Sequence, residues 1–223
     1  MEETVLIRQY NKEEIPGINE SEVWRYAGYR GIPDISDREL QEELQSVLKL
    51  VDNELVYKVV YLVDEKLPFE TSSVDLLKCL EGSSEVCMFA ATLGIGIDRL
   101  IARYEKLSPT KALLLQALGA ERVEALCDKF CSDYEDKCGK KLTMRFSPGY
   151  GDLPLSTQRE FFRILDCNRK VGISLNDSLL MSPSKSVTAV FGVKDSNDGN
   201  ERKDWCVHKC ESCPNVNCEY RNI

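Results

Sequence analysis

The chain has 223 residues, of which 43% are hydrophobic and 30% are charged. This length and composition suit one compact domain, or one domain with a short appendage, and exclude a disordered chain. The longest stretch without a charged residue, 86–97, is shorter than the roughly 20 apolar residues that a membrane-spanning helix needs. The acidic N-terminus lacks the pattern of a signal peptide. We therefore expect a cytoplasmic protein without a membrane partner.

The charge balance also narrows the class of partner. The 29 basic and 37 acidic residues give a net charge of −8, and no run of basic residues stands out. Because phosphate neutralisation dominates nucleic-acid affinity, we expect no nucleic-acid partner. The chain has one histidine and lacks the G-x-S-x-G, H-E-x-x-H and P-loop motifs, which argues against the common hydrolase and nucleotide-hydrolysing sites.

The first half of the chain predicts alternating helices and strands. Residues 1–34 look irregular, and they contain the string Trp24-Arg-Tyr-Ala-Gly-Tyr-Arg-Gly31. That string suits an aromatic plug at the domain edge, or arginines and tyrosines that stack on a planar or anionic ligand. A helix capped by Asp34 or Ser36 runs to about Val51. Further along we predict strands at 54–63 and 85–93. We also predict a helix at 73–80 and a second helix that follows the turn at 94–98 and ends at about residue 104.

Gly94 and Gly96 follow a predicted strand, as the glycines of a dinucleotide-binding turn do. The third glycine of that fingerprint is missing, because position 99 is an arginine. We therefore interpret the two glycines as a tight turn between a strand and a helix.

Ser108-Pro109 and Gly139 mark the start and the stop of one long helix. Its predicted buried stripe consists of Leu115, Gly119, Val123, Leu126, Phe130 and Tyr134. Cys127, Cys131 and Cys138 lie on the edge of this stripe, and we favour core packing over a metal site for them. Glu124 lies at the border of the buried face, and we expect Glu121 to point further toward solvent.

The second half predicts a strand at 141–145, a loop rich in Gly and Pro, and a helix from a capping box of Thr157 and Glu160 to about residue 170. A strand follows at 187–193, and a polar linker begins at about residue 195. These elements indicate an α+β fold.

The loop carries a family motif. The string Arg145-Phe-Ser-Pro-Gly-Tyr150, followed by Pro154, resembles the R-x-x-P-G-Y-x-x-x-P loop of the activation domain of vitamin B12-dependent methionine synthase. Met181, Pro183, Ser186 and Val187 resemble the turn that precedes a strand in the same family. The resemblance covers 108–193 and is absent from the C-terminal tail. The strings near residues 25–31 and 92–94 resemble short, free-standing versions of this domain.

The resemblance implies a twisted antiparallel sheet flanked by helices, with S-adenosylmethionine bound in a shallow groove. The domain presents the methyl group to cob(II)alamin on a partner, and an electron from a low-potential donor accompanies the transfer that restores methylcobalamin. The partner is a cobalamin-dependent methionine synthase or another corrinoid protein.

The resemblance also implies a set of binding residues. Arg145 would hold the ligand's carboxylate, which suits a guanidinium. Backbone groups at Ser147 would contact the adenine, Gly149 would allow close approach, and Tyr150 would lie beside the ligand. Glu124 is the best match for a helix glutamate that contacts polar groups, with Glu121 as the alternative. The family's N-terminal acidic contact has no counterpart here, and a later aromatic contact falls near Phe191.

The C-terminal tail holds Cys206, Cys210, Cys213 and Cys218, with His208 among them. Their C-x3-C-x2-C-x4-C spacing suits four ligands around one [4Fe–4S] cluster or one zinc ion, although free thiols are an alternative. The first three share the spacing of radical enzymes that cleave S-adenosylmethionine, but the position at the end of a short chain argues against that class.

Three segments follow from these observations. Residues 1–107 form the N-terminal part of the domain, 108–194 its core with the motif loop, and 195–223 the linker and Cys-rich tail. The predicted function is a free-standing, S-adenosylmethionine-binding activation subunit. The alternatives are an iron–sulfur electron carrier that reduces corrinoid proteins without this ligand, and a plain S-adenosylmethionine sensor with a zinc-clamped tail.

Overall fold

The structure, a computed structural model, describes residues 5–29 and 38–195. Within them, a five-stranded sheet has the order β1-β2-β3-β7-β4, and each neighbouring pair is antiparallel. The strands are β1 (Leu6–Tyr10), β2 (Tyr57–Asp64), β3 (Glu85–Thr92), β4 (Lys141–Leu142) and β7 (Ser186–Lys194). The predicted α+β fold with an antiparallel sheet is confirmed.

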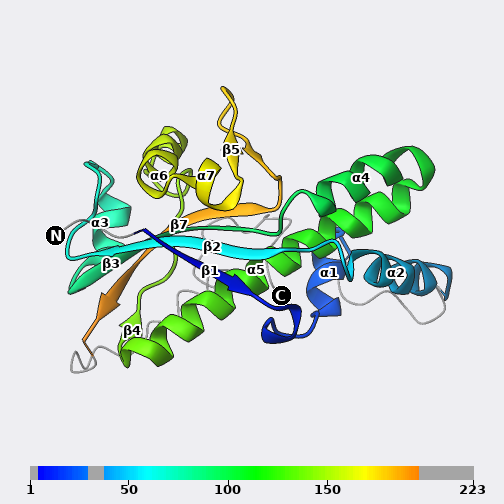
Figure 1. Cartoon of the computed structure of the whole chain (residues 1–223), viewed down its shortest axis with the longest axis horizontal. Helices are drawn as coiled ribbons and strands as arrows, with labels where there is room; N and C mark the ends of the chain where they lie inside the picture. The colour runs from blue at the N-terminus through cyan, green and yellow to red at the C-terminus, as the bar shows by residue number, and fades with distance from the viewer. Residues whose placement is uncertain (1–4, 30–37, 196–223) are drawn as a thin grey trace.

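The three inner strands are buried on both faces. Because side chains alternate along a strand, Phe89 and Phe191 face one layer of helices while Met88 and Val190 face the other. The sheet thus lies between two helical layers, as Figure 1 shows.

The first layer is built around α5 (Pro109–Cys138) and also contains α1 (Glu20–Tyr26), α2 (Arg38–Val51) and α4 (Gly96–Leu107). The Phe130 ring on α5 lies 5.1 Å from the Phe89 ring and 6.2 Å from the Phe191 ring, measured between centroids. These aromatic contacts fix the long helix against the middle of the sheet.

The second layer contains α3 (Val74–Leu80), α6 (Gln158–Leu165) and α7 (Cys167–Val171). A small hairpin of β5 (Ser174–Leu175) and β6 (Met181–Ser182) projects beyond it (Figure 1). Two short 3-10 turns, η1 (Lys12–Glu14) and η2 (Leu155–Thr157), complete the described elements. No helix in this part of the chain is long and apolar enough to cross a membrane.

The predicted bounds of the long helix agree with the structure. The Ser108 side chain accepts a hydrogen bond from the Lys111 backbone N–H, and Gly139 ends the helix with φ of 65°. Packing requires a glycine at position 96, because a Cβ there would collide with the carbonyl oxygen of Glu54. The turn interpretation of Gly94 and Gly96 is therefore supported.

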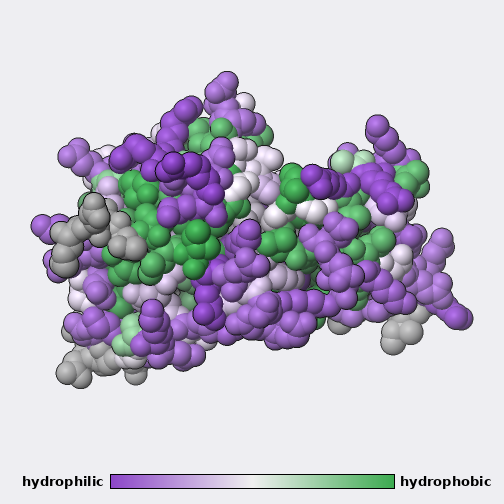
Figure 2. All heavy atoms as spheres, in the orientation of Figure 1, coloured by the Kyte–Doolittle hydropathy of each residue, from purple (hydrophilic) through white to green (hydrophobic). Residues whose placement is uncertain are grey.

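Three sequence predictions are wrong. The region predicted as irregular contains β1 and α1, and β1 escaped detection because this edge strand buries only Tyr10 and shows no alternation. Leu6 and Ile7 are exposed, as is typical of side chains on an edge strand. Figure 2 shows the largest gathering of hydrophobic side chains on the left of the face, among hydrophilic ones. The single helix predicted after residue 157 is two helices, because Asp166 adopts φ of 51° between α6 and α7. Thr157 makes no capping bond, since its backbone is already helical after η2.

Candidate functional site

Arg145 lies at the edge of the sheet. The next residue, Phe146, exchanges two backbone hydrogen bonds with Val190 of β7, at 2.8 and 2.9 Å. This bridge continues the edge begun by β4 and fixes the backbone on which Arg145 stands. The Arg145 side chain extends from there to α5.

On α5 the guanidinium meets two carboxylates. Arg145 Nη1 donates to Asp128 Oδ1 at 2.7 Å, and Arg145 Nη2 donates to Glu124 Oε2 at 2.9 Å. The two acids are four residues apart and therefore share one helix face. The exposed fractions of the side chains are 24% for Arg145, 45% for Glu124 and 70% for Asp128. The site is thus open to solvent, and a guanidinium with five N–H donors keeps donors for a ligand.

The buried thiols of Cys127 and Cys131, also on α5, lie close enough to Arg145 to interact with its charge. Burial raises the pKa of Cys131 to about 11 and that of Cys127 well above its usual value, although the charge of Arg145 opposes both shifts. Both thiols are therefore protonated and neutral at pH 7. Cys127, Cys131 and Cys138 pack in or against the core, as predicted. Among the residues that the structure describes, no group of three or more His, Cys, Asp or Glu side chains could hold a metal ion.

The motif loop after Arg145 folds back on itself. The Gly149 N–H donates to the Leu153 carbonyl at 2.9 Å, and the Tyr150 N–H donates to the Ser147 carbonyl at 3.1 Å. Gly149 has φ of 92°, a conformation that other residues rarely adopt. The Tyr150 side chain is 64% exposed, so this loop presents an aromatic ring outward.

Asp152 ties the same loop to the start of α3. Its carboxylate accepts hydrogen bonds from the Ser73 hydroxyl, from the Val74 N–H at 2.7 Å and from the Asp75 N–H at 3.2 Å. These bonds, that of Ser73 first, lower the pKa of Asp152. No local pattern indicates this anchor, because its donors lie almost 80 residues away in the chain.

Glu121 occupies a different environment from Glu124. Its side chain is 6% exposed and pairs with Arg122, and its Oε1 accepts the Asn19 N–H at 3.1 Å. Arg122 also donates to the carbonyls of Pro16 and Gly17 at 2.7 and 3.1 Å. The expectation that Glu121 points to solvent is therefore wrong, because the segment before α1 covers the outer face of α5. Of the two candidate glutamates, only Glu124 pairs with Arg145.

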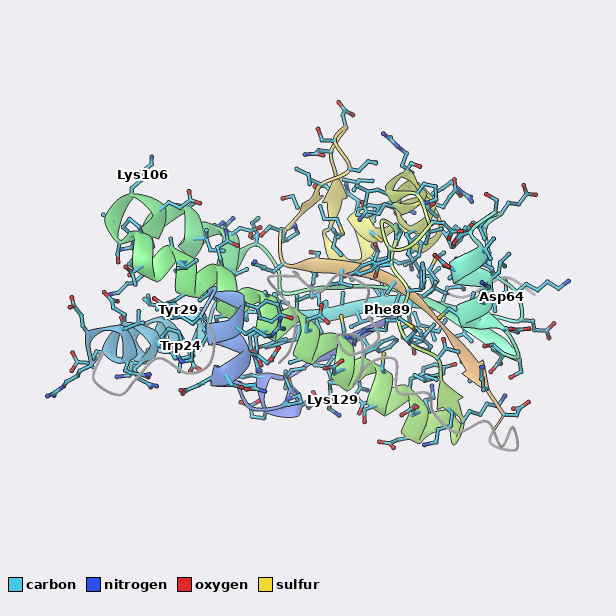
Figure 3. The ribbon with its side chains drawn as sticks, turned by 180° about the vertical axis from the view of Figure 1, so that it is seen from behind. Trp24, Tyr29, Asp64, Phe89, Lys106 and Lys129 are labelled. Atoms are coloured by element: carbon cyan, nitrogen blue, oxygen red, sulfur yellow. The ribbon has the colours of Figure 1, made fainter. Side chains whose placement is uncertain are left out.

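The aromatic string of α1 is mainly structural. Trp24 is fully buried, and its ring meets that of Tyr29 edge-on with centroids 5.5 Å apart (Figure 3). Arg25 pairs with Glu22 and stacks over the ring of Tyr26 at 4.3 Å. Burial raises the pKa of Tyr26, and the charge of Glu124 adds to that shift. The Glu124 carboxylate that faces Arg145 therefore also acts electrostatically on Tyr26.

Two further predictions fall elsewhere. Phe191, near the family's later aromatic contact, has no exposed surface and packs among the rings of Phe89, Phe130 and Tyr134. The predicted metal ligands Cys206, Cys210, Cys213 and Cys218 lie outside the described residues. Arg30 and Gly31, the last two residues of the aromatic string that begins at Trp24, also lie outside the described residues.

Together these features define an α+β domain with a candidate ligand site at the edge of an antiparallel sheet, between a long helix and a Gly-Tyr loop. The family model described as "Vitamin B12 dependent methionine synthase, activation domain" matches residues 68–199, and the chain belongs to this family. A solved structure described as the MetH reactivation domain bound to AdoHcy has a TM-score of 0.67. The match covers 86% of this chain and 79% of that chain at 14% identity, so it shows the shared fold. No curated protein matches the chain.

Proposed function

We propose that this protein binds S-adenosylmethionine and acts as an activation subunit, separate from its partner, for reductive remethylation of cob(II)alamin on a cobalamin-dependent methionine synthase. Family membership supports the activation role. The observation that carries the ligand is Arg145, held by two carboxylates at an open edge of the sheet. The related solved structure is described as bound to AdoHcy, which has the same amino-acid and nucleoside parts.

The residues present fit this ligand chemically. The remaining N–H donors of Arg145 suit the ligand's carboxylate, and Glu124 suits its ammonium group. Backbone groups at Ser147 would contact the adenine, as the motif implies. Gly149 lets that backbone lie close to the ligand, and the exposed ring of Tyr150 offers a surface beside it.

The chain's own role is to bind and to orient. When bound, S-adenosylmethionine supplies a methyl group from its sulfonium, and one electron from a low-potential donor balances its transfer to the corrinoid. Arg145 and Glu124 hold the amino-acid end of the ligand. The exposure of Glu124 and Tyr150 leaves this side of the domain accessible to a partner, either a methionine synthase or another corrinoid protein. A cytoplasmic location fits this role.

Titration calorimetry with S-adenosylmethionine tests the proposal. Charge-assisted hydrogen bonds contribute about 1.5–3 kcal/mol, so Arg145→Ala should weaken binding at least tenfold. Arg163→Ala is the matched control, because Arg163 also pairs with a carboxylate, that of Glu160, but lies on α6. Unchanged affinity in a folded Arg145→Ala variant would refute the assignment of the site.

The spacing of the C-terminal cysteines favours a second candidate function. A [4Fe–4S] cluster on Cys206, Cys210, Cys213 and Cys218 would make the chain an electron relay, or an electron carrier that does not use S-adenosylmethionine. Metal analysis after anaerobic purification separates iron from zinc. If no iron is found, the electron-carrier hypothesis is wrong. If the chain binds S-adenosylmethionine, that result counts against an electron carrier that works without this ligand.

A further inference from the structure

The acidic pair on α5 has one more negative charge than Arg145 can neutralise. Arg145 contributes one positive charge, while Glu124 and Asp128 contribute two negative charges within 3 Å of it. The nearest arginine on α1, Arg25, is already paired with Glu22 and does not offset the excess. The thiols of Cys127 and Cys131 are neutral and leave this balance unchanged.

The two forms of the proposed ligand differ by one charge at the sulfur. S-adenosylmethionine has a carboxylate, an ammonium group and a sulfonium, and therefore a net charge of about +1 at neutral pH. AdoHcy, the product of methyl loss, has a neutral thioether and no net charge. A site with an excess negative charge attracts the first more strongly than the second.

We propose that Asp128 is a specificity-determining residue that makes this site prefer S-adenosylmethionine over AdoHcy. This inference rests on the proposed function and extends it to a residue that the motif does not include. Asp128 supplies the excess charge, because Glu124 alone would balance Arg145. Such a preference keeps the product from occupying the site after methyl transfer.

Asp128 is also the residue that can be neutralised with the least structural change. Its side chain is 70% exposed, and the 2.9 Å bond from Arg145 to Glu124 does not involve Asp128, so we expect that bond to persist when Asp128 becomes an amide. A residue that only positioned Arg145 would affect both ligands equally, since both have the same carboxylate. The ratio of the two affinities therefore separates a charge effect from a positioning effect.

The experiment is calorimetric titration of the full chain with S-adenosylmethionine and with AdoHcy, at low salt and without oxygen. Asp128→Asn should reduce the affinity ratio of the two ligands at least threefold, and Asp128→Glu should preserve it. Asp136→Asn is the control, because it removes one charge from an exposed position of the same helix, about 12 Å further along. Added salt should reduce the ratio in the wild type more than in Asp128→Asn.

Three outcomes overturn the inference in distinguishable ways. Equal weakening of both ligands by Asp128→Asn would make Asp128 a positioning residue while the proposed function stands. An equal fall of the ratio in Asp136→Asn would show a general charge effect rather than one of the site. Failure of the wild type to bind either ligand would remove the proposed function and this inference together.

Discussion

The buried pair of Glu121 and Arg122 gives the sharpest test of how the N-terminal segment is held. The two side chains are 6% and 5% exposed, and Glu121 also accepts the Asn19 N–H. Glu121→Gln keeps the size and one acceptor oxygen of this side chain. It removes the negative charge and leaves the guanidinium of Arg122 buried without a counter-ion.

The expected loss of stability follows from these contacts. Removing one partner of a buried ion pair costs about 3–5 kcal/mol. Arg122 still donates to the carbonyls of Pro16 and Gly17, and Asn19 can still donate to the new amide oxygen. We therefore expect the lower end, about 3 kcal/mol, out of a total of roughly 5–15 kcal/mol for a domain.

Urea unfolding at 25 °C, followed by circular dichroism, measures this loss. Asp136→Asn on the exposed face of the same helix should change stability by less than about 0.5 kcal/mol. The folded Glu121→Gln variant should bind S-adenosylmethionine within about twofold of the wild type, whereas Glu124→Gln should weaken binding by about tenfold. A loss below about 1 kcal/mol, or the reverse pattern of ligand affinities, would refute the structural role assigned to Glu121.

Three other experiments test the motif loop and the buried thiol of Cys131. Gly149→Ala should cost about 1–3 kcal/mol in urea unfolding, because an alanine is strained at φ of 92°; an unchanged midpoint would contradict this. Alkylation of Cys131, followed by mass spectrometry, should be slow at pH 7.5 and accelerate toward pH 11, since burial raises its pKa to about 11. Fast labelling at pH 7.5 would disprove it. The lowered pKa of Asp152 means that its contribution to stability is present above pH 3.8 and is lost as the pH falls through the lowered value. Asp152→Asn should therefore flatten the acid limb of a stability–pH curve, and an unchanged limb would count against the anchor.

Local signals explain why some elements were predictable. The cap of Ser108, the proline after it and the left-handed Gly139 are determined by neighbouring residues, so the bounds of α5 followed from the sequence. The strand β1 has no such signal, because an edge strand with one buried residue shows no period. Asp166 also breaks the helix after residue 157 without a glycine or proline to mark the turn.

The candidate site also combines residues that a local pattern predicts with residues that only the folded chain brings together. Arg145, Gly149 and Tyr150 were found through a contiguous motif, but the partners of that motif come from elsewhere in the chain. Asp128 is 17 residues from Arg145, and its only local signal is its position four residues after Glu124 on one helix face. Helical periodicity alone could not place Glu121, because the segment that buries it lies more than 100 residues earlier.

The position of the site follows from the two different surfaces of α5. One side of this helix packs Phe130 against the sheet, and Cys127 and Cys131 mark the boundary where apolar packing ends. Glu124 and Asp128 lie just beyond that boundary, where the segment that follows β4 brings Arg145. Because the thiols stay neutral, the charge of this cluster is determined, among the residues that the structure describes, by Arg145 and the two acids that pair with it. A helix that completes the core on one side thus presents a charged site on the other, and the same packing that stabilises the sheet holds the site in place.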